Sequence, residues 1–190
     1  MTGREDERPD ELIEHAPVTL RRFRADDLDA LFQAVTESLG HLRPWMPWAA
    51  HYSLASAEEY LAGSTKSWDE GTEYNYAILT AIPGGIALAG VAGLMARIGP
   101  GGLEIGYWVH RAYTRRGLAT AATAALVDQA FRLPGVDRVE IVHDELNVAS
   151  AGIPRKLGFT EVGRRPLDFR PPAGSGTGVV WRLTTQAQTR

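Results

Sequence analysis

Cysteine is missing from this 190-residue chain altogether. Its absence excludes a disulfide scaffold, a thiolate nucleophile and every metal site with cysteine ligands. The five histidines lack a paired spacing, so we expect no zinc or other metal site. An excess of basic charge is missing too, because 20 Lys and Arg against 23 Asp and Glu give a formal net charge of −3. That balance argues against a nucleic-acid partner bound through its phosphates.

Long hydrophobic runs are also missing. No apolar stretch approaches the roughly 20 residues that span a bilayer, so we expect no membrane partner. Residues 1–14 carry eight charges and no apolar signal-peptide segment, and we interpret them as a mobile N-terminal arm. The length of the chain suits a single core, which predicts one domain over residues 15–185 and a cytoplasmic protein.

The rest of the chain alternates between helical and strand-like patterns. Apolar residues spaced three and four apart predict helices at 26–36, 56–71, 118–133 and 149–157. Runs of β-forming residues predict strands at 18–23, 74–80, 87–97, 103–110, 138–143, 160–164 and 178–183. Ser56 and Glu59 have the spacing of a capping box at the start of the second helix. This order of elements predicts a mixed α/β (α+β) fold rather than a doubly wound sheet.

The stretch from Leu103 to Ala122 carries the residues most suited to chemistry. Alternation along a strand puts Leu103, Ile105, Tyr107 and Val109 on a core face, and Glu104, Gly106, Trp108 and His110 on the other face. Gly117 then precedes a helix whose first amides can hold a phosphate, and Arg115 and Arg116 add positive charge. A basic turn before a helix is, however, more often a solvated surface feature.

This turn resembles a known motif. Thr114-Arg115-Arg116-Gly117-Leu118-Ala119 is similar to motif A of the GNAT N-acetyltransferases, Q/R-x-x-G-x-G/A, except that Thr114 replaces Gln or Arg. The residues Asn147 to Ser150 and Arg155 to Phe159 resemble the N-x-x-S and K-x-G-F block of that family. Together with Glu104–Trp108 and Arg43–Trp45, they resemble the RimJ/RimL-type branch.

The resemblance covers residues 18–183 and implies a fold. That fold is a central, mostly antiparallel sheet of six or seven strands, flanked by about four helices. Its parallel pair, here the strands at 103–110 and 138–143, splays apart. The resemblance also implies acetyl-CoA as cosubstrate and a primary amine as acceptor, either a protein N-terminal α-amine or a small molecule, acetylated by direct attack in a ternary complex.

The same resemblance implies the residues that bind acetyl-CoA. The backbone of Tyr107, Trp108 and Val109 is expected to pair with the thioester carbonyl and the pantetheine arm. The other expected contacts are Thr114, Arg115, Arg116, Gly117, Leu118, Ala119, Thr120, Asn147, Ser150, Arg155 and Lys156. Asn147 is also a good helix N-cap, and Arg155 and Lys156 equally suit a solvated face.

Two residues are candidates for proton transfer. Glu104 is the candidate base, and its alternative is a half-exposed carboxylate paired with a cross-strand Arg or Lys. Ser150 is the candidate acid for the departing thiolate, because Pro154 stands where many GNAT members have a tyrosine; its alternative is a hydroxyl that caps the helix. Pro154 has no N–H for the carbonyl of Ser150, which predicts a bent or very short helix with that carbonyl free. His110 is expected to shape the turn instead.

The acceptor site is expected between the early helices and a late loop. Trp45, Trp48, Tyr52 and Phe169 are candidates to line it, although packing under a loop is the commoner fate of such residues. Asp168 or Glu161 is a candidate for holding an ammonium group. The alternatives to acetyl transfer are another acyl-CoA, such as succinyl-CoA, and a non-catalytic acyl-CoA-binding module. Edge strands such as 178–183 are compatible with a homodimer.

Overall fold

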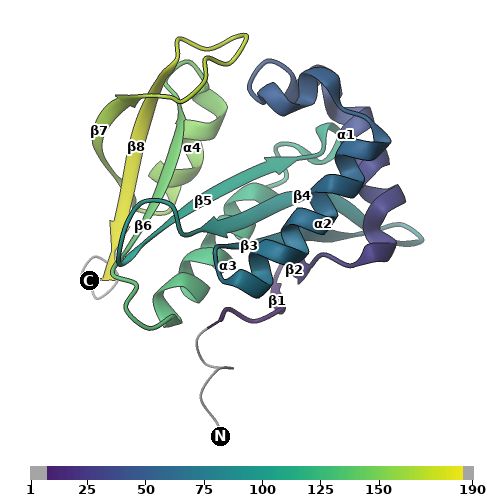
Figure 1. Ribbon diagram of the computed structural model, residues 1–190, viewed down its shortest axis with the longest axis horizontal. Coiled ribbons are helices and arrows are strands. Elements are labelled where there is room, and N and C mark those ends of the chain that lie inside the picture. The colour runs from purple at the N-terminus through teal and green to yellow at the C-terminus, as the bar shows by residue number, and fades with distance from the viewer. Residues whose placement is uncertain (1–7, 186–190) are drawn as a thin grey trace, which may run out of the picture.

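A computed structural model describes residues 8–185. They form an eight-stranded sheet in the order β1-β2-β3-β4-β5-β6-β8-β7, in which the β5–β6 pair is parallel and the neighbouring pairs are antiparallel (Figure 1). The strands are β1 Leu12–His15, β2 Val18–Arg22, β3 Glu73–Ile82, β4 Gly85–Met95, β5 Gly102–Val109, β6 Arg138–Asp144, β7 Thr160–Pro166 and β8 Thr177–Thr184. The predicted α+β class with a mostly antiparallel sheet is confirmed.

Four α-helices flank the sheet. They are α1 Leu28–Leu42, α2 Leu54–Glu70, α3 Leu118–Arg132 and α4 Val148–Lys156. Three 3-10 segments accompany them: η2 Ala25–Asp27 lies between β2 and α1, η3 Pro47–His51 between α1 and α2, and η4 Arg111–Tyr113 between β5 and α3. Within residues 8–185, no helix has the length and apolarity needed to cross a bilayer.

The predicted N-terminal arm, residues 1–14, needs correction where the structure describes it. Residues 1–7 lie outside the described residues, but β1 pairs antiparallel with β2. Ile13 of β1 is buried, and the Tyr76 hydroxyl donates to the carbonyl of Asp10 at 2.8 Å. One buried residue among many charges gives almost no periodic signal, which is why this strand was not predicted.

Helix α2 shows how a cap can be displaced by one turn. Its N-cap is Ser53, not Ser56, because the Ser53 hydroxyl accepts from the Ser56 backbone N–H at 3.2 Å. Ser56 is instead the third helical residue, and its side chain completes a capping box with the Ser53 backbone. The predicted end at Gly71 is confirmed, since Gly71 has φ 73°, a left-handed conformation suited to glycine.

The sheet separates two hydrophobic cores. The first lies mainly between the sheet and α3, and it includes Ile105, Leu126 and Ile141. The second lies under α1 and α2, where Val91 packs with residues of both helices and Trp108 lies against the cluster. The alternation predicted for β5 is therefore confirmed, because Ile105 and Trp108 belong to opposite faces.

The parallel strands separate after a short paired section. β5 and β6 pair at three positions, of which Glu104 opposite Glu140 is the last. Beyond Glu104, β5 continues with β4 to Val109, while β6 continues with β8 to Asp144. Figure 1 shows the resulting V between the two parts of the sheet. The predicted splayed pair is thus confirmed, and it leaves one backbone edge of β5 without a strand partner.

The edge strands differ from the prediction. Residues 178–183 were predicted as an edge, but β8 lies between β6 and β7. The edges of the described sheet are β1 and β7, and every residue of β7 is exposed. The argument for a homodimer from residues 178–183 is therefore wrong.

Candidate active site

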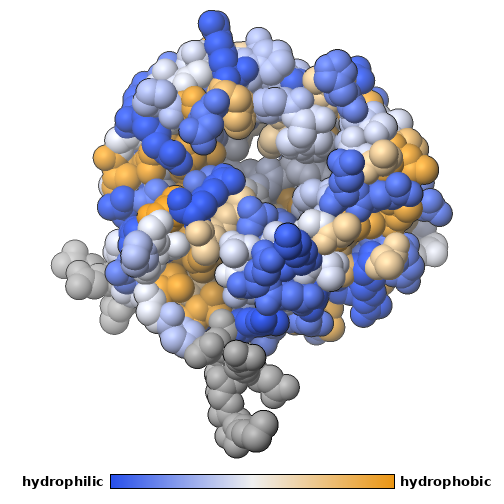
Figure 2. Space-filling model, viewed as in Figure 1, coloured by the Kyte–Doolittle hydropathy of each residue, from blue (hydrophilic) through white to orange (hydrophobic). Residues whose placement is uncertain are grey.

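A cavity of about 1160 Å³ opens where β5 and β6 separate. Figure 2 shows a hollow at this place in the same view. Its wall combines α1, α2 and the segment around η3 with β4 and β5 on one side, and β6, α4 and the loop after β7 on the other. The predicted site residues that line it are Trp45, Trp48, Tyr52, Glu104, Tyr107, Trp108, Asn147, Ser150 and Phe169.

The other predicted site residues lie outside this cavity. They are Val109, Thr114, Arg115, Arg116, Gly117, Leu118, Ala119, Thr120, Arg155 and Lys156. The Arg116 guanidinium lies over the Tyr113 ring at 5.2 Å from its centroid, and that of Arg155 lies over Trp181 at 5.3 Å. Most of this group forms the turn before α3 and the first turn of that helix, next to the cavity along β5.

The turn before α3 suits a diphosphate. Gly117 is the N-cap of α3 with φ 79°, and no side chain caps the helix there. A Cβ atom at Gly117 would meet nothing within 4 Å, so the approach to the first helical amides is open. These amides and the positive end of the helix favour an anion. The residues present therefore fit the diphosphate of coenzyme A.

His110 holds this turn against α1. Its Nδ1 accepts from the Ala112 N–H at 3.1 Å, which leaves the proton on Nε2, 3.1 Å from the Glu37 carboxylate. Next to it, the Arg111 N–H donates to the Ser38 hydroxyl at 3.1 Å. Hydrogen bonds from Gln33 and His110 lower the pKa of Glu37. His110 lies outside the cavity and shapes the turn, as we expected from its place at the end of the strand.

Glu104 is a buried carboxylate at the floor of the cavity. Its side chain is 5 % exposed, and Oε1 accepts from Arg97 Nη2 at 2.5 Å. Oε2 is 3.6 Å from Arg165 Nη2 and has no hydrogen-bond partner among the described residues. The hydrogen bond to Glu104 raises the pKa of Arg97, although burial opposes this shift. The half-exposed alternative is wrong about exposure and right about the arginine partner, and one buried oxygen is left to receive a donor.

Tyr107 and Ser150 face each other across the gap between β5 and β6. The Ser150 backbone N–H donates to Asn147 Oδ1 at 3.2 Å, so Asn147, not the serine hydroxyl, caps α4. The Tyr107 hydroxyl lies 3.2 Å from Ser150 Oγ and 3.3 Å from the Ser150 carbonyl. Burial raises the pKa of Tyr107 to about 12. Helix α4 has nine residues, but the prediction of a free Ser150 carbonyl is wrong, because that carbonyl accepts from Tyr107.

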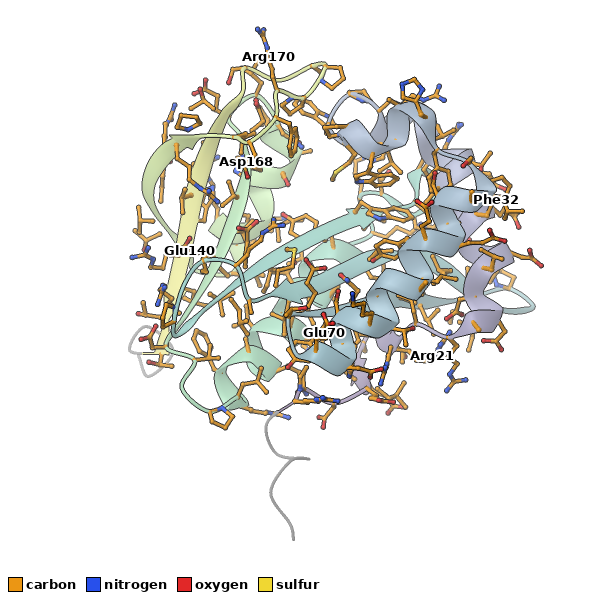
Figure 3. The ribbon with its side chains drawn as sticks, viewed as in Figure 1. Arg21, Phe32, Glu70, Glu140, Asp168 and Arg170 are labelled. Carbon is orange, nitrogen blue, oxygen red and sulfur yellow. The ribbon has the colours of Figure 1, made fainter. Side chains whose placement is uncertain are left out.

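Aromatic rings line the part of the cavity beneath α1 and α2. The Trp48 ring centroid lies 5.9 Å from that of Tyr52 and 6.3 Å from that of Trp108. Tyr52 stacks on Phe32 of α1, which Figure 3 labels, at 6.0 Å. The Tyr52 hydroxyl is buried without a partner among the described residues, and burial raises its pKa to about 12. This part of the cavity wall is therefore aromatic and largely apolar.

The loop between β7 and β8 closes over the cavity. Asp144 accepts from the backbone N–H groups of Ser175 and Gly176 at 3.1 and 2.8 Å, and it thereby fixes the base of the loop. Burial raises the pKa of Asp144, but these backbone donors outweigh it and lower the pKa overall. The Ala173 N–H donates to the Pro44 carbonyl at 3.0 Å, which joins the loop to the segment before η3. In Figure 3, Asp168 lies on this loop and Arg170 points outward from its top.

Sequence reasoning missed several residues of this site. Arg97, which donates to Glu104 Oε1, follows β4, and Arg165, 3.6 Å from Glu104 Oε2, belongs to β7. Asp144 directly follows a predicted strand, and that position was the one available signal for it. Of the two candidates for holding an ammonium group, Asp168 lines the cavity, whereas Glu161 pairs with Arg164 outside it.

Comparisons with known proteins place this site in context. Residues 18–160 match the family model described as the acetyltransferase (GNAT) domain. YdaF of Bacillus subtilis, described as a candidate ribosomal N-acetyltransferase, is 27% identical over 152 residues, which are 77% of this chain and 80% of YdaF.

Solved structures share the fold. RimL, a ribosomal L7/L12 α-N-protein acetyltransferase in complex with coenzyme A, superimposes with a TM-score of 0.83 at 22% identity, covering 93% of this chain and 99% of RimL. RimJ of Mycobacterium smegmatis, in complex with a CoA disulfide, gives a TM-score of 0.80 at 22% identity, covering 96% of this chain and 90% of RimJ.

Proposed function

This chain belongs to the GNAT acetyltransferase family, and from that premise we propose that it transfers the acetyl group of acetyl-CoA to the N-terminal α-amine of a protein. The names of YdaF and RimL support this choice of acceptor, because both refer to ribosomal N-acetyltransferases. The observation that carries the proposal is the cavity at the strand split. A buried carboxylate oxygen of Glu104 and the hydroxyls of Ser150 and Tyr107 line that one cavity.

Acetyl-CoA binds, in this proposal, along the free edge of β5. The amides at the start of α3 hold the diphosphate, and Asn147 lies beside the pantetheine arm. Alternate residues of β5 present their N–H groups to opposite edges, so those of Tyr107 and Val109, on the edge that β6 has left, are available to the thioester carbonyl. Donors fixed in this way stabilise the oxyanion as it develops. The bound molecule supplies the activated acetyl group.

The acceptor amine binds on the other side of the thioester. Its ammonium group donates to Glu104 Oε2, which is buried and lacks another donor at hydrogen-bond distance. Arg97 fixes the other oxygen, so the carboxylate is held in one orientation. The ammonium proton leaves through Glu104, directly or through a water molecule, and the neutral amine then attacks the carbonyl carbon in a ternary complex. Ser150 protonates the departing thiolate.

The loop between β7 and β8, which is joined to the segment before η3, supports an extended acceptor rather than a bulky one. Because the Ala173–Pro44 hydrogen bond joins the two loops, the acceptor enters beneath them. A flexible chain end passes such an opening more easily than an amine on a rigid surface. The aromatic wall formed by Trp48, Tyr52 and Trp108 then contacts the first side chains of the peptide.

Thiol release from acetyl-CoA tests this function. The purified protein is incubated with acetyl-CoA and either peptides with free N-termini, the same peptides with blocked N-termini, polyamines or aminoglycosides. We expect release with the free peptides only, and mass spectrometry should place the acetyl group on the α-amine. Release with the polyamines or aminoglycosides alone would indicate a small-molecule acetyltransferase, and faster release from succinyl-CoA would change the donor. Coenzyme A binding without any release would indicate a binding module.

A further inference from the structure

Tyr107 and Ser150 bring two hydroxyl groups together across the gap between β5 and β6. The phenolic oxygen is 3.2 Å from Ser150 Oγ and 3.3 Å from the Ser150 carbonyl, so it reaches either acceptor without a backbone movement. Both residues line the cavity. The pair therefore connects the strand on one side of the gap with the first turn of α4 on the other.

Pro154 explains why this carbonyl is available to Tyr107. In a regular helix the Ser150 carbonyl accepts from the N–H of the residue four positions later. That residue is Pro154, which lies inside α4 and has no N–H. The Tyr107 hydroxyl occupies the vacated position at 3.3 Å. The proline thus fixes the phenol beside the serine hydroxyl, which a packing role alone would not require.

We propose that Tyr107 is a proton-relay residue that resupplies Ser150 when Ser150 protonates the leaving thiolate. This inference rests on the proposed function. When the carbon–sulfur bond breaks, its electron pair goes to sulfur, and the Ser150 hydroxyl proton moves to that sulfur. The Tyr107 hydroxyl proton moves to Ser150 Oγ in the same step. Tyr107 then recovers a proton from water, which has received the proton lost by the attacking nitrogen, so the reaction is balanced.

The chemistry of the two groups favours a relay over a serine acting alone. An isolated alkoxide in a largely apolar cavity is costly, because burial penalises a charge without a partner. A phenol at hydrogen-bond distance avoids this charge by moving its own proton as the serine proton leaves. Charge then spreads over the aromatic ring of Tyr107 instead of remaining on Ser150. A phenylalanine would fill the same space on β5 and lose this capacity together with the hydrogen bond to the Ser150 carbonyl.

The test compares Tyr107→Phe, Ser150→Ala and the double variant with the wild type. Each single change should lower kcat at least about 10-fold, since a positioned proton donor contributes about 10²–10⁴-fold. Residues that act as one unit are not additive, so the double variant should match the worse single variant within about twofold. Calorimetry without an acceptor should give Tyr107→Phe a coenzyme A affinity within about twofold of the wild type. Tyr74→Phe, a buried phenol outside the cavity, is the matched control.

A change of leaving group separates a relay from a structural role. An acetyl thioester of an acidic aryl thiol releases a thiolate that needs no proton, so the Tyr107→Phe loss should shrink to less than about threefold. A loss equal to that with acetyl-CoA would indicate a structural role and overturn the relay. Wild-type kcat in Tyr107→Phe, or losses that multiply in the double variant, would also overturn it. Absence of thiol release by the wild type would instead overturn the proposed function, and the relay with it.

The pH dependence gives an independent measurement. Burial raises the pKa of Tyr107 to about 12, and the protonated phenol is the form that donates. Wild-type kcat should therefore not fall between about pH 8 and pH 10, where a phenol with an ordinary pKa near 10 begins to ionise. A fall centred near pH 10 that disappears in Tyr107→Phe would support the relay but contradict the raised pKa that burial gives this hydroxyl.

Discussion

Glu104 and Glu140 stand opposite each other at the last paired position of β5 and β6, and they differ in what lies beyond them. Both are buried, and each binds an arginine: Glu104 binds Arg97, and Glu140 binds Arg182 through two nitrogens of its guanidinium. Glu104, however, lines the cavity with an unpartnered oxygen, whereas Glu140 does not line it. The ion pair of Glu104 on β5 thus lies at the cavity, whereas that of Glu140 on β6 lies within the paired sheet.

The two glutamates differ in their place relative to the strand split, not in residue type. One register position earlier, Leu103 and Val139 still pair, and neither lines the cavity. At Glu104 the neighbouring strand begins to depart, so its carboxylate faces a space that a substrate can enter. Glu140 in Figure 3 lies on β6, on the side that continues into regular pairing with β8.

The largest expected effect separates the two glutamates by activity. Glu104→Gln should lower kcat/KM for the acceptor about 100-fold or more, because a neutral amide neither attracts the ammonium nor accepts its proton. Glu140→Gln should stay within about twofold of the wild type. Steady-state kinetics of thiol release measures both, with coenzyme A affinity as the check on folding. Equal losses in the two variants would remove the base assignment.

A second test exchanges the arginine partners. Arg97→Gln should lower kcat/KM about 10-fold, because Glu104 keeps its charge but loses the donor that fixes its orientation. Arg182→Gln, the matched change at Glu140, should leave kcat/KM within about twofold. The same kinetic assay reports both values. A larger effect from Arg182 than from Arg97 would show that the sheet, not the cavity, controls the reaction.

A third test asks whether the diphosphate side is independent of both glutamates. Gly117→Val places a β-branched residue at φ 79°, a conformation that such residues rarely adopt, and it distorts the start of α3. Coenzyme A affinity measured by calorimetry should fall about 10-fold. In Glu104→Gln and Glu140→Gln the affinity should be unchanged. Unchanged binding in Gly117→Val would place the diphosphate elsewhere.

The smallest expected difference is in stability, because substituting either glutamate should lower the free energy of unfolding by a similar amount. Breaking a fully buried ion pair costs roughly 3–5 kcal/mol. The arginines here are about half exposed, with 56% for Arg97 and 41% for Arg182, so solvent screening reduces the cost. Glu104→Gln and Glu140→Gln should each lower the free energy of unfolding by about 1–2 kcal/mol in urea denaturation. A cost confined to Glu140→Gln would mean that Glu104 lacks a structural contribution.

Much of this site was predictable where local periodicity determines it. Alternation along β5 placed Glu104 and Trp108 on one face and Tyr107 on the other, as the structure confirms. The start of α3 at Gly117 followed from a glycine before a long apolar stripe. Such features depend on neighbours within a few residues, so a single sequence contains them.

The remaining features depend on contacts between distant segments. Arg165 reaches Glu104 from 61 positions along the chain, and no local pattern connects them. For Tyr107, only a role of the backbone was predicted. Its hydroxyl contacts Ser150, a residue that the path of β6 and α4 brings next to it. The hydrogen bond between Ala173 and Pro44 likewise joins segments that are distant in the sequence. The sequence shows that Pro154 lacks an N–H, but it does not show that the Tyr107 hydroxyl replaces that donor.

A crystal structure with bound coenzyme A would test most directly whether the strand split is the site of acetyl transfer. We expect the diphosphate on the first amides of α3 and the pantetheine arm along the free edge of β5. The thiol sulfur should lie about 3.5 Å from Ser150 Oγ, within hydrogen-bond reach. A sulfur atom outside the gap between β5 and β6, or a diphosphate bound away from Gly117, would contradict this expectation.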